Sequence, residues 1–132
     1  MTLFDDIKII ITAARSQAFR AVNSLLLTTY WQIGKCVVED EQAGKVRAKY
    51  GEATLKILAE KLTLEFGKGF DFTNLTNMRK FYIAFPKLDA LRQELSWTHY
   101  RIISRQASEE KRLFYVQEAA DCGWSGRQLE RK

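Results

Sequence analysis

The sequence predicts an all-α fold, with one long N-terminal helix followed by a helix-turn-helix-like bundle of five to six shorter helices. The first observation is that 132 residues contain only seven glycines and one proline, Pro86, which leaves little room for the turns of a strand-rich fold. The second is that apolar residues recur every three or four positions, and no segment shows a convincing strand pattern. This length is typical of one domain, so we expect residues 1–132 to form a single helical unit.

The first expected helix runs from about residue 3 to residue 40, with no breaker before Gly34. Such a helix would be roughly 55 Å long, longer than a domain of this size is wide, so it would extend beyond its own core. Its main apolar stripe consists of Leu3, Ile7, Ile10, Ala14, Ala18, Val22, Leu25 and Thr29.

Further apolar residues widen this surface beyond one face of the helix: Phe4, Ile11, Leu26, Tyr30 and Trp31. A helix that is apolar on two sides needs two partners. We therefore expect helix 3–40 to pack against the rest of the chain and also to form a homodimer. The alternative is a break near Ser16 or Asn23 that folds the segment into a hairpin.

Two helices are expected in the middle of the chain. An acidic end at residues 39–41 and a basic link at residues 45–51, with room for one helical turn, precede helix 52–66. Helix 74–85 follows a glycine turn, begins after Asp71 or Thr73, and ends before Pro86. The expected buried stripe of helix 52–66 comprises Leu55, Leu58, Ala59, Leu62 and Phe66. Residues 88–93 are long enough for a short further helix.

The C-terminal third predicts helices at residues 97–105 and 109–121, capped by Ser96 and Ser108, and a last helix after Ser125. Gly123 can end the second of these, and Ser125 with Gln128 forms a capping box. Ala119, Gly123 and Leu129 have the spacing of a DNA-binding helix-turn-helix, although Glu118 stands where an apolar residue is expected. The alternative is an ordinary pair of helices joined by a glycine turn.

The net charge of +5 is concentrated in the second half, where residues 67–132 carry twelve basic and eight acidic side chains. Basic pairs on three expected helices are candidate phosphate contacts, and Gln128 is a candidate base contact. The alternative is that these are solvated charges or intramolecular partners of Asp71, Glu94 and Glu118. The candidate nucleic-acid-binding residues are Arg79, Lys80, Arg101, Arg105, Arg127, Gln128 and Arg131.

No cluster typical of catalysis, cofactor binding or metal binding stands out. The only histidine, His99, lies between aromatic residues and is expected to be partly buried and structural. Asp89 followed by Glu109-Glu110-Lys111 has the form of a nuclease motif, but these acids begin a helix and face solvent rather than converging on a metal.

The two cysteines lack metal-site spacing, and we expect Cys36 and Cys122 to be buried thiols in a reducing cytoplasm. No signal peptide is visible, and no apolar run approaches the ~20 residues of a membrane helix.

An ordered series of motifs then becomes apparent along almost the whole chain. It comprises Tyr30-Trp31-x-Ile33-Gly34, Tyr50-Gly51, Glu65-Phe66-Gly67-Lys68-Gly69-Phe70, Asn74-Leu75, Met78-Arg79, Phe81-Tyr82, Leu95-Ser96-Trp97, His99-Tyr100, Phe114-Tyr115, Glu118-Ala119 and Trp124-Ser125-x-Arg127-x-Leu129-x-Arg131. With these motifs the chain resembles the N-terminal domain of the YhcG-like bacterial family.

The resemblance implies a larger protein in which this helical domain precedes a nuclease domain of the PD-(D/E)XK type. No nuclease residues can be carried over, because their positions are absent, so we expect no enzymatic activity of this fragment. The resemblance also implies an aromatic core formed by Trp97, Tyr100, Phe114, Tyr115 and Trp124.

We therefore expect a dimeric, nucleic-acid-binding module of a nuclease protein, with DNA as the expected ligand and RNA left open. The alternative is an oligomerisation or protein-docking domain without nucleic-acid contact.

Overall fold

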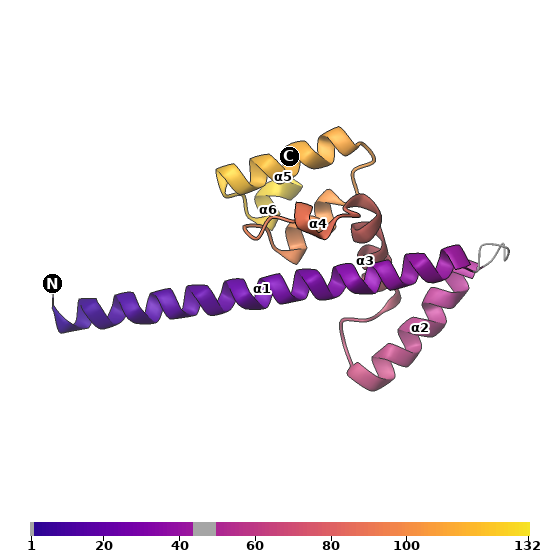
Figure 1. Cartoon of the computed structure of the whole chain (residues 1–132), viewed down its shortest axis with the longest axis horizontal. Helices are drawn as coiled ribbons and strands as arrows, with labels where there is room; N and C mark the ends of the chain where they lie inside the picture. The colour runs from indigo at the N-terminus through magenta and orange to yellow at the C-terminus, as the bar shows by residue number, and fades with distance from the viewer. Residues whose placement is uncertain (1, 44–49) are drawn as a thin grey trace.

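The computed structural model describes residues 2–43 and 50–132, and in these residues the regular structure is entirely helical (Figure 1). The all-α prediction is therefore confirmed. The long helix runs unbroken through Ser16 and Asn23, so the hairpin alternative is wrong. The helical turn considered for residues 45–51 falls largely outside the described part. The elements are α1 (Leu3–Ala43), α2 (Tyr50–Phe66), α3 (Phe72–Ala84), the 3-10 helix η1 (Leu88–Ala90), α4 (Trp97–Ile103), α5 (Glu109–Cys122) and α6 (Gly126–Glu130).

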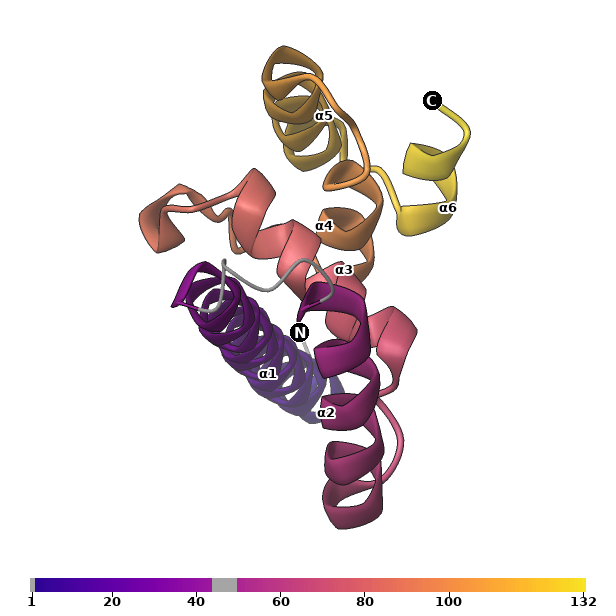
Figure 2. The same ribbon diagram turned by 90° about the vertical axis from the view of Figure 1, so that its right-hand side faces the viewer.

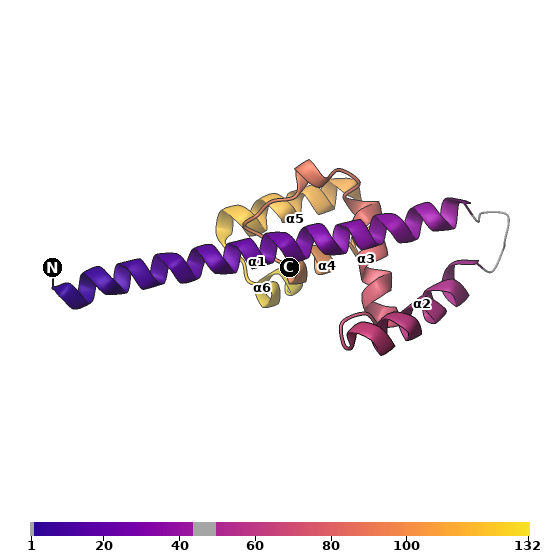
Figure 3. The ribbon, with the colours of Figure 1, turned by 60° about the horizontal axis from the view of Figure 1, so that its bottom comes forward.

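Helix α3 crosses the second half of α1, and this crossing holds the long helix to the rest of the chain (Figures 1 and 3). Gly34 makes the close approach possible, because a Cβ atom at this position would lie 2.2 Å from the main-chain oxygen of Met78. Nearby, the indole nitrogen of Trp31 donates a hydrogen bond of 2.7 Å to the carbonyl of Phe85. The two helices are thus joined by backbone contact as well as by side chains.

The core has two parts, and α3 contributes to both. Met78 and Leu75 face α2, whereas Phe81 and Phe85 face α4. The larger cluster is formed by Leu27, Trp31, Phe81, Phe85, Leu95, Tyr100, Ile102, Ile103, Val116, Ala119 and Leu129. The smaller cluster is formed by Val37, Leu55, Ala59, Leu75 and Met78. Helix α3 therefore connects α2 to the C-terminal helices.

The predicted helix ends agree closely with the structure. Asp71 accepts a hydrogen bond from the amide of Asn74, which decides the choice between Asp71 and Thr73 as the cap of α3. Ser108 caps α5, and Gly123 ends it in the left-handed conformation with a φ of 65°. Ser125 and Gln128 form the expected capping box at the start of α6. These local signals position the C-terminal helices.

The first half of α1 extends away from the other helices (Figures 1 and 3). Residues 3–22, here called the α1 overhang, are exposed except for half-buried Asp5. Its large apolar side chains are open to solvent: Phe4 is 71% exposed and Phe19 73%. The part of α1 that packs inside the chain lies further along and on another face, at Leu27, Trp31, Gly34 and Val37. The predicted two-sided apolar helix is therefore present, with one side uncovered.

Four predicted burials are wrong. Phe114 is 56% exposed and Phe66 64% exposed, although both belong to predicted apolar stripes. On α5 the side chains that face the core are those of Val116 and Ala119. Both cysteines, Cys36 and Cys122, are exposed rather than buried. In each case the apolar stripe is wider than the surface that the neighbouring helices cover.

Candidate nucleic-acid interface

Helices α4 and α6 lie side by side and bring the C-terminal basic residues together. The imidazole Nε2 of His99, at the start of α4, is 2.6 Å from the carbonyl oxygen of Trp124, just before α6. A Cβ atom on Gly126 would lie 2.6 Å from the methyl carbon of Thr98, so the helices start in close contact. The half-buried His99 also caps α4 through Ser96, as expected of a structural histidine.

Five cations lie on α4 and in the turn after it, on α6 and in the two residues that follow α6, and we call them the α4–α6 face: Arg101, Arg105, Arg127, Arg131 and Lys132. Residues 97–108 and 123–132 carry these five basic side chains and one acidic side chain, Glu130, whereas α5 carries two basic and four acidic ones. Figure 2 shows α5 and α6 on different sides of α4, so the helix richest in acidic residues and the last helix lie apart within this small unit.

The α4–α6 face retains most of its charge. Arg105 lies 3.9 Å from Glu130, at the limit of an ion pair, and both side chains are largely exposed. Within the described residues, Arg101, Arg127 and Arg131 form no ion pair, and the buried Nε of Arg101 has no hydrogen-bond partner. The expected partners Glu94 and Asp71 are engaged elsewhere, with Arg92 and at the α3 cap respectively.

Sequence reasoning missed one member of the face, Lys132. Its ammonium nitrogen lies 4.9 Å from the centre of the Trp124 ring, a cation–π distance that places the chain end beside the turn between α5 and α6. The hydroxyl of Tyr115 donates to the carbonyl of Lys132 at 3.2 Å. The available signal was the adjacency of Lys132 to Arg131.

The structure does not group the other predicted contacts with this face. Arg79 is directed to the end of α1, where its Nε donates to Glu41 at 2.6 Å, so its charge is compensated inside the chain. Lys80 is exposed on α3. Gln128 is exposed on α6, but its Oε1 accepts the amide of Ser125 at 2.7 Å. A bidentate contact with adenine needs both the oxygen and the nitrogen of the side-chain amide. Capping of α6 by Gln128 therefore competes with hydrogen bonding to a base.

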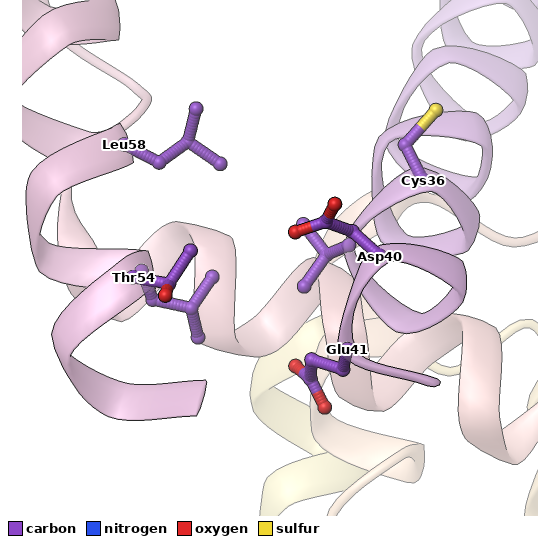
Figure 4. Close-up of a pocket in the computed structure, with 7 residues that line it drawn as sticks. Cys36, Asp40, Glu41, Thr54 and Leu58 are labelled. Carbon is purple, nitrogen blue, oxygen red and sulfur yellow. The ribbon is translucent and has the colours of Figure 1, made fainter. Parts of the chain in front are cut away.

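A separate pocket of about 320 Å³ lies between α1 and α2 (Figure 4). Cys36, Asp40 and Glu41 line it from α1, while Thr54, Leu55 and Leu58 line it from α2. Its acidic rim is partly compensated, because Glu41 is bonded to Arg79. In the part of the chain that the structure describes, no three His, Cys, Asp or Glu side chains are grouped as a metal site would require. Glu109 and Glu110 are exposed in the first turn of α5.

Four groups have shifted pKa values, and burial or hydrogen bonding explains each of them. The side-chain hydrogen bond to Glu94 raises the pKa of the Arg92 guanidinium. Burial raises the pKa of the Tyr100 phenol, whose oxygen accepts the main-chain N–H of Arg92 at 2.6 Å. The hydrogen bond from Arg92 lowers the pKa of the Glu94 carboxyl. Desolvation, followed by a hydrogen bond to Glu118, raises the pKa of the Cys122 thiol. None of these groups belongs to the α4–α6 face.

Comparisons with known proteins give consistent results. A family model described as the DUF1016 N-terminal domain matches residues 6–132. A curated protein of Escherichia coli (strain K12), named "Putative nuclease YhcG", is 32% identical over 164 aligned positions. The alignment covers 98% of this chain and 43% of that relative, so the chain spans less than half of the relative's length. No solved structure matches the chain. No helix in the described parts is long and apolar enough to cross a membrane.

Proposed function

The chain belongs to the DUF1016 N-terminal domain family, and from this premise we propose that it is the nucleic-acid-binding module of a nuclease protein. In this proposal the ligand is DNA, and the catalytic domain is the part of the full-length protein that lies outside residues 1–132. This division of roles is supported by the relative's name, "Putative nuclease YhcG", and by its length, which is more than twice that of its matched region.

The observation that carries the proposal is the separation of charge around α4. The α4–α6 face has five cations, its two segments contain a single carboxylate, Glu130, and Arg127 and Arg131 form no ion pair among the described residues. A phosphate backbone is bound by a group of exposed cations, whose binding releases counterions. Acidic residues gather on α5, so one side of this unit would face the nucleic acid and the other would not.

The arrangement of α5 and α6 supports a helix-turn-helix. In support of this proposal, Ala119 and Leu129 are 1% and 3% exposed, and Gly123 ends α5 in the left-handed conformation. However, α6 has only five residues, and Gln128 is occupied in its cap. The proposal therefore assigns the α4–α6 face to phosphate contacts, which position a protein on nucleic acid without reading its sequence.

A titration of fluorescent duplex DNA, followed by anisotropy, tests this proposal. If four arginines contact phosphates, raising the salt from about 50 to about 200 mM should weaken binding on the order of 100-fold. The double variant Arg127→Glu/Arg131→Glu should reduce the slope of log affinity against log salt by about two.

The matched control is Lys61→Glu/Lys68→Glu, which makes the same change in net charge at exposed positions on α2 and in the turn that follows it. It should leave both the affinity and the salt slope close to those of the unmodified chain. The proposal is refuted if the unmodified chain binds neither duplex nor single-stranded nucleic acid at low salt. Equal losses in the two double variants would also refute it. Tighter binding of RNA than DNA would refute the choice of DNA.

A second candidate function, oligomerisation, is favoured by a different observation. The α1 overhang exposes a continuous set of large apolar side chains, including Leu3 at 75%, Phe4 at 71% and Ile10 at 66%. Contiguous apolar surface of this kind marks a protein interaction site. We propose that it joins two copies of the domain. This role is compatible with nucleic-acid binding and does not depend on it.

A further inference from the structure

The α1 overhang contains a heptad pattern on one narrow stripe. Apolar residues alternate in steps of three and four through three heptads, which is the spacing of a two-helix coiled coil. All of them are exposed, and the four large ones range from 46% for Ile7 to 71% for Phe4. We call them the heptad stripe: Phe4, Ile7, Ile11, Ala14, Ala18, Ala21 and Leu25.

The heptad stripe faces away from the rest of the chain. An α-helix turns by about 100° per residue, which puts the stripe on roughly the opposite side of α1 from Leu27, Trp31 and Gly34. These three residues are buried against the other helices. The chain therefore cannot cover its own heptad stripe, while a second helix can approach it without meeting the other helices of the domain.

We infer that the heptad stripe pairs with the same stripe of a second copy, antiparallel and in one register. In this register Phe4 lies opposite Ala21 of the second copy, Ile7 opposite Ala18, and Ile11 opposite Ala14. The inference rests on the proposed pairing of two copies and specifies its geometry. It does not depend on nucleic-acid binding.

Side-chain size selects this orientation. Between Phe4 and Ala21 the large residues of the stripe lie near the N-terminus and the three alanines lie further along. An antiparallel pair in the stated register places one large and one small side chain in each of the six layers of this segment, which gives an even separation of the helices. A parallel pair would instead stack phenylalanine on phenylalanine and isoleucine on isoleucine at one end, and alanine on alanine at the other. It would leave the alanine layers poorly packed.

The length of the overhang agrees with this register. Among the described residues, the first hydrogen bond from α1 to another part of the chain is donated by the side chain of Asn23 to the carbonyl of Leu95, in the segment before α4, at 2.9 Å. The register places Leu3 level with Val22 of the second copy, so the paired segment ends where the packed part of the domain begins.

Charge also favours the antiparallel orientation. The two helix dipoles run in opposite directions in the antiparallel pair, whereas in a parallel pair their like ends would lie together.

The area is sufficient for a reversible dimer. Leu25 lies beyond the paired segment, so the other six stripe residues and the flanking Leu3, Ile10 and Val22 supply nine apolar side chains per helix. At about 60 Å² each, two helices would bury on the order of 1,100 Å². This is just below the range of about 1,200–2,000 Å² for stable interfaces, so the pairing should depend on concentration.

Analytical ultracentrifugation at about 100 μM protein tests the pairing. This concentration is above the micromolar dissociation constants of the weakest interfaces of ordinary size. The unmodified chain should sediment as a dimer and dissociate on dilution. Ala18→Asp should give a monomer with an unchanged circular dichroism spectrum for the remainder of the domain. The matched control Phe19→Asp changes the next residue, which is 73% exposed and outside the stripe, and should remain dimeric.

Cross-linking tests the register. In a background without the exposed native thiols, Cys36→Ser/Cys122→Ser, one sample carries Phe4→Cys and another carries Ala21→Cys. Mixing and mild oxidation should give a disulfide-linked dimer, and neither sample alone should do so. Cross-linking of Phe4→Cys alone would overturn the antiparallel orientation while leaving dimerisation intact. A monomer at every concentration would overturn the pairing itself. Neither result would bear on DNA binding, which is measured separately.

Discussion

The variant Gly34→Ala tests the close contact between α1 and α3, which holds the long helix to the rest of the chain. Gly34 is buried in α1 where α3 crosses it. An added Cβ atom would lie 2.2 Å from the main-chain oxygen of Met78 and 3.0 Å from the Cβ of Tyr82, whereas ordinary contacts begin at 3.4 Å. Since the nearest obstacle is backbone, no change of rotamer can relieve the overlap, and the two helices must separate by about 1 Å.

Two opposing effects determine the size of the change in stability. Alanine is favoured over glycine inside a helix by about 1 kcal/mol, which stabilises the variant. Overpacking of a well-packed core typically costs about 1–3 kcal/mol, and we take the upper end because the whole α1–α3 contact must widen. The expected net loss in the free energy of unfolding is about 2 kcal/mol. For a domain of this size, this corresponds to a decrease in Tm of roughly 8 °C.

Thermal unfolding followed by circular dichroism measures this effect, with Gln32→Ala as the control. Gln32 is exposed on the same helix, so its replacement should change Tm by less than about 2 °C. Truncating Tyr82 to alanine in the Gly34→Ala background should not restore Tm, because the backbone of Met78 remains in place. A Tm for Gly34→Ala equal to or above that of the unmodified chain would refute the close crossing.

Two further predictions concern the larger cluster. Trp31→Phe removes the donor to the Phe85 carbonyl and should lower the free energy of unfolding by about 1–3 kcal/mol in urea titrations, and an unchanged value would contradict the hydrogen bond. Burial raises the pKa of Tyr100 above its ordinary value of 10.0, so its contribution to stability is complete below that pH and is lost as pH rises through the folded-state pKa. Urea titrations between about pH 8 and about pH 11 should therefore show a decline above about pH 10 that is smaller in Tyr100→Phe, and equal declines would contradict this assignment.

The elements of the fold could be predicted from sequence because their boundaries depend on neighbouring residues. Asp71, Ser108 and Ser125 each accept a hydrogen bond from an amide three residues ahead, an interaction that sequence spacing reveals directly. Gly123 adopts a conformation that few other residues tolerate. The length of α1 follows from the absence of any proline or early glycine.

The buried faces were harder to predict because they depend on distant residues. Leu25 and Leu27 are equally apolar, yet Leu25 is 67% exposed and Leu27 only 3%, since α3 and the segment before α4 cover one side of α1. Phe114 was expected in the core for its size, but the neighbouring Val116 faces inward. Periodicity identifies an apolar face and does not say whether the same chain covers it.

The candidate interface could be predicted only in part, because residue spacing along one helix is visible in the sequence but contacts between distant residues are not. The spacing of four residues predicted that Arg101 and Arg105, and also Arg127 and Arg131, would share helix faces, although α4 ends at Ile103 and α6 at Glu130. The position of α6 beside α4 depends on the contact between Thr98 and Gly126. Nothing in the local sequence predicts this contact. The pairing of Arg79 with Glu41 likewise joins residues 38 positions apart.

Because α3 crosses α1 at Gly34, a small rotation of α1 at this crossing would move its distant N-terminal end by a larger amount. From this fulcrum to Leu3 the helix extends about 46 Å, so a tilt of about 5° at the crossing would displace the tip by about 4 Å. Because the tip would engage a second copy, side chains around the fulcrum such as Tyr82 would set the angle between two paired domains without lying in their interface. The distance between two α4–α6 faces and their relative orientation would then depend on residues that contact neither the second copy nor the nucleic acid.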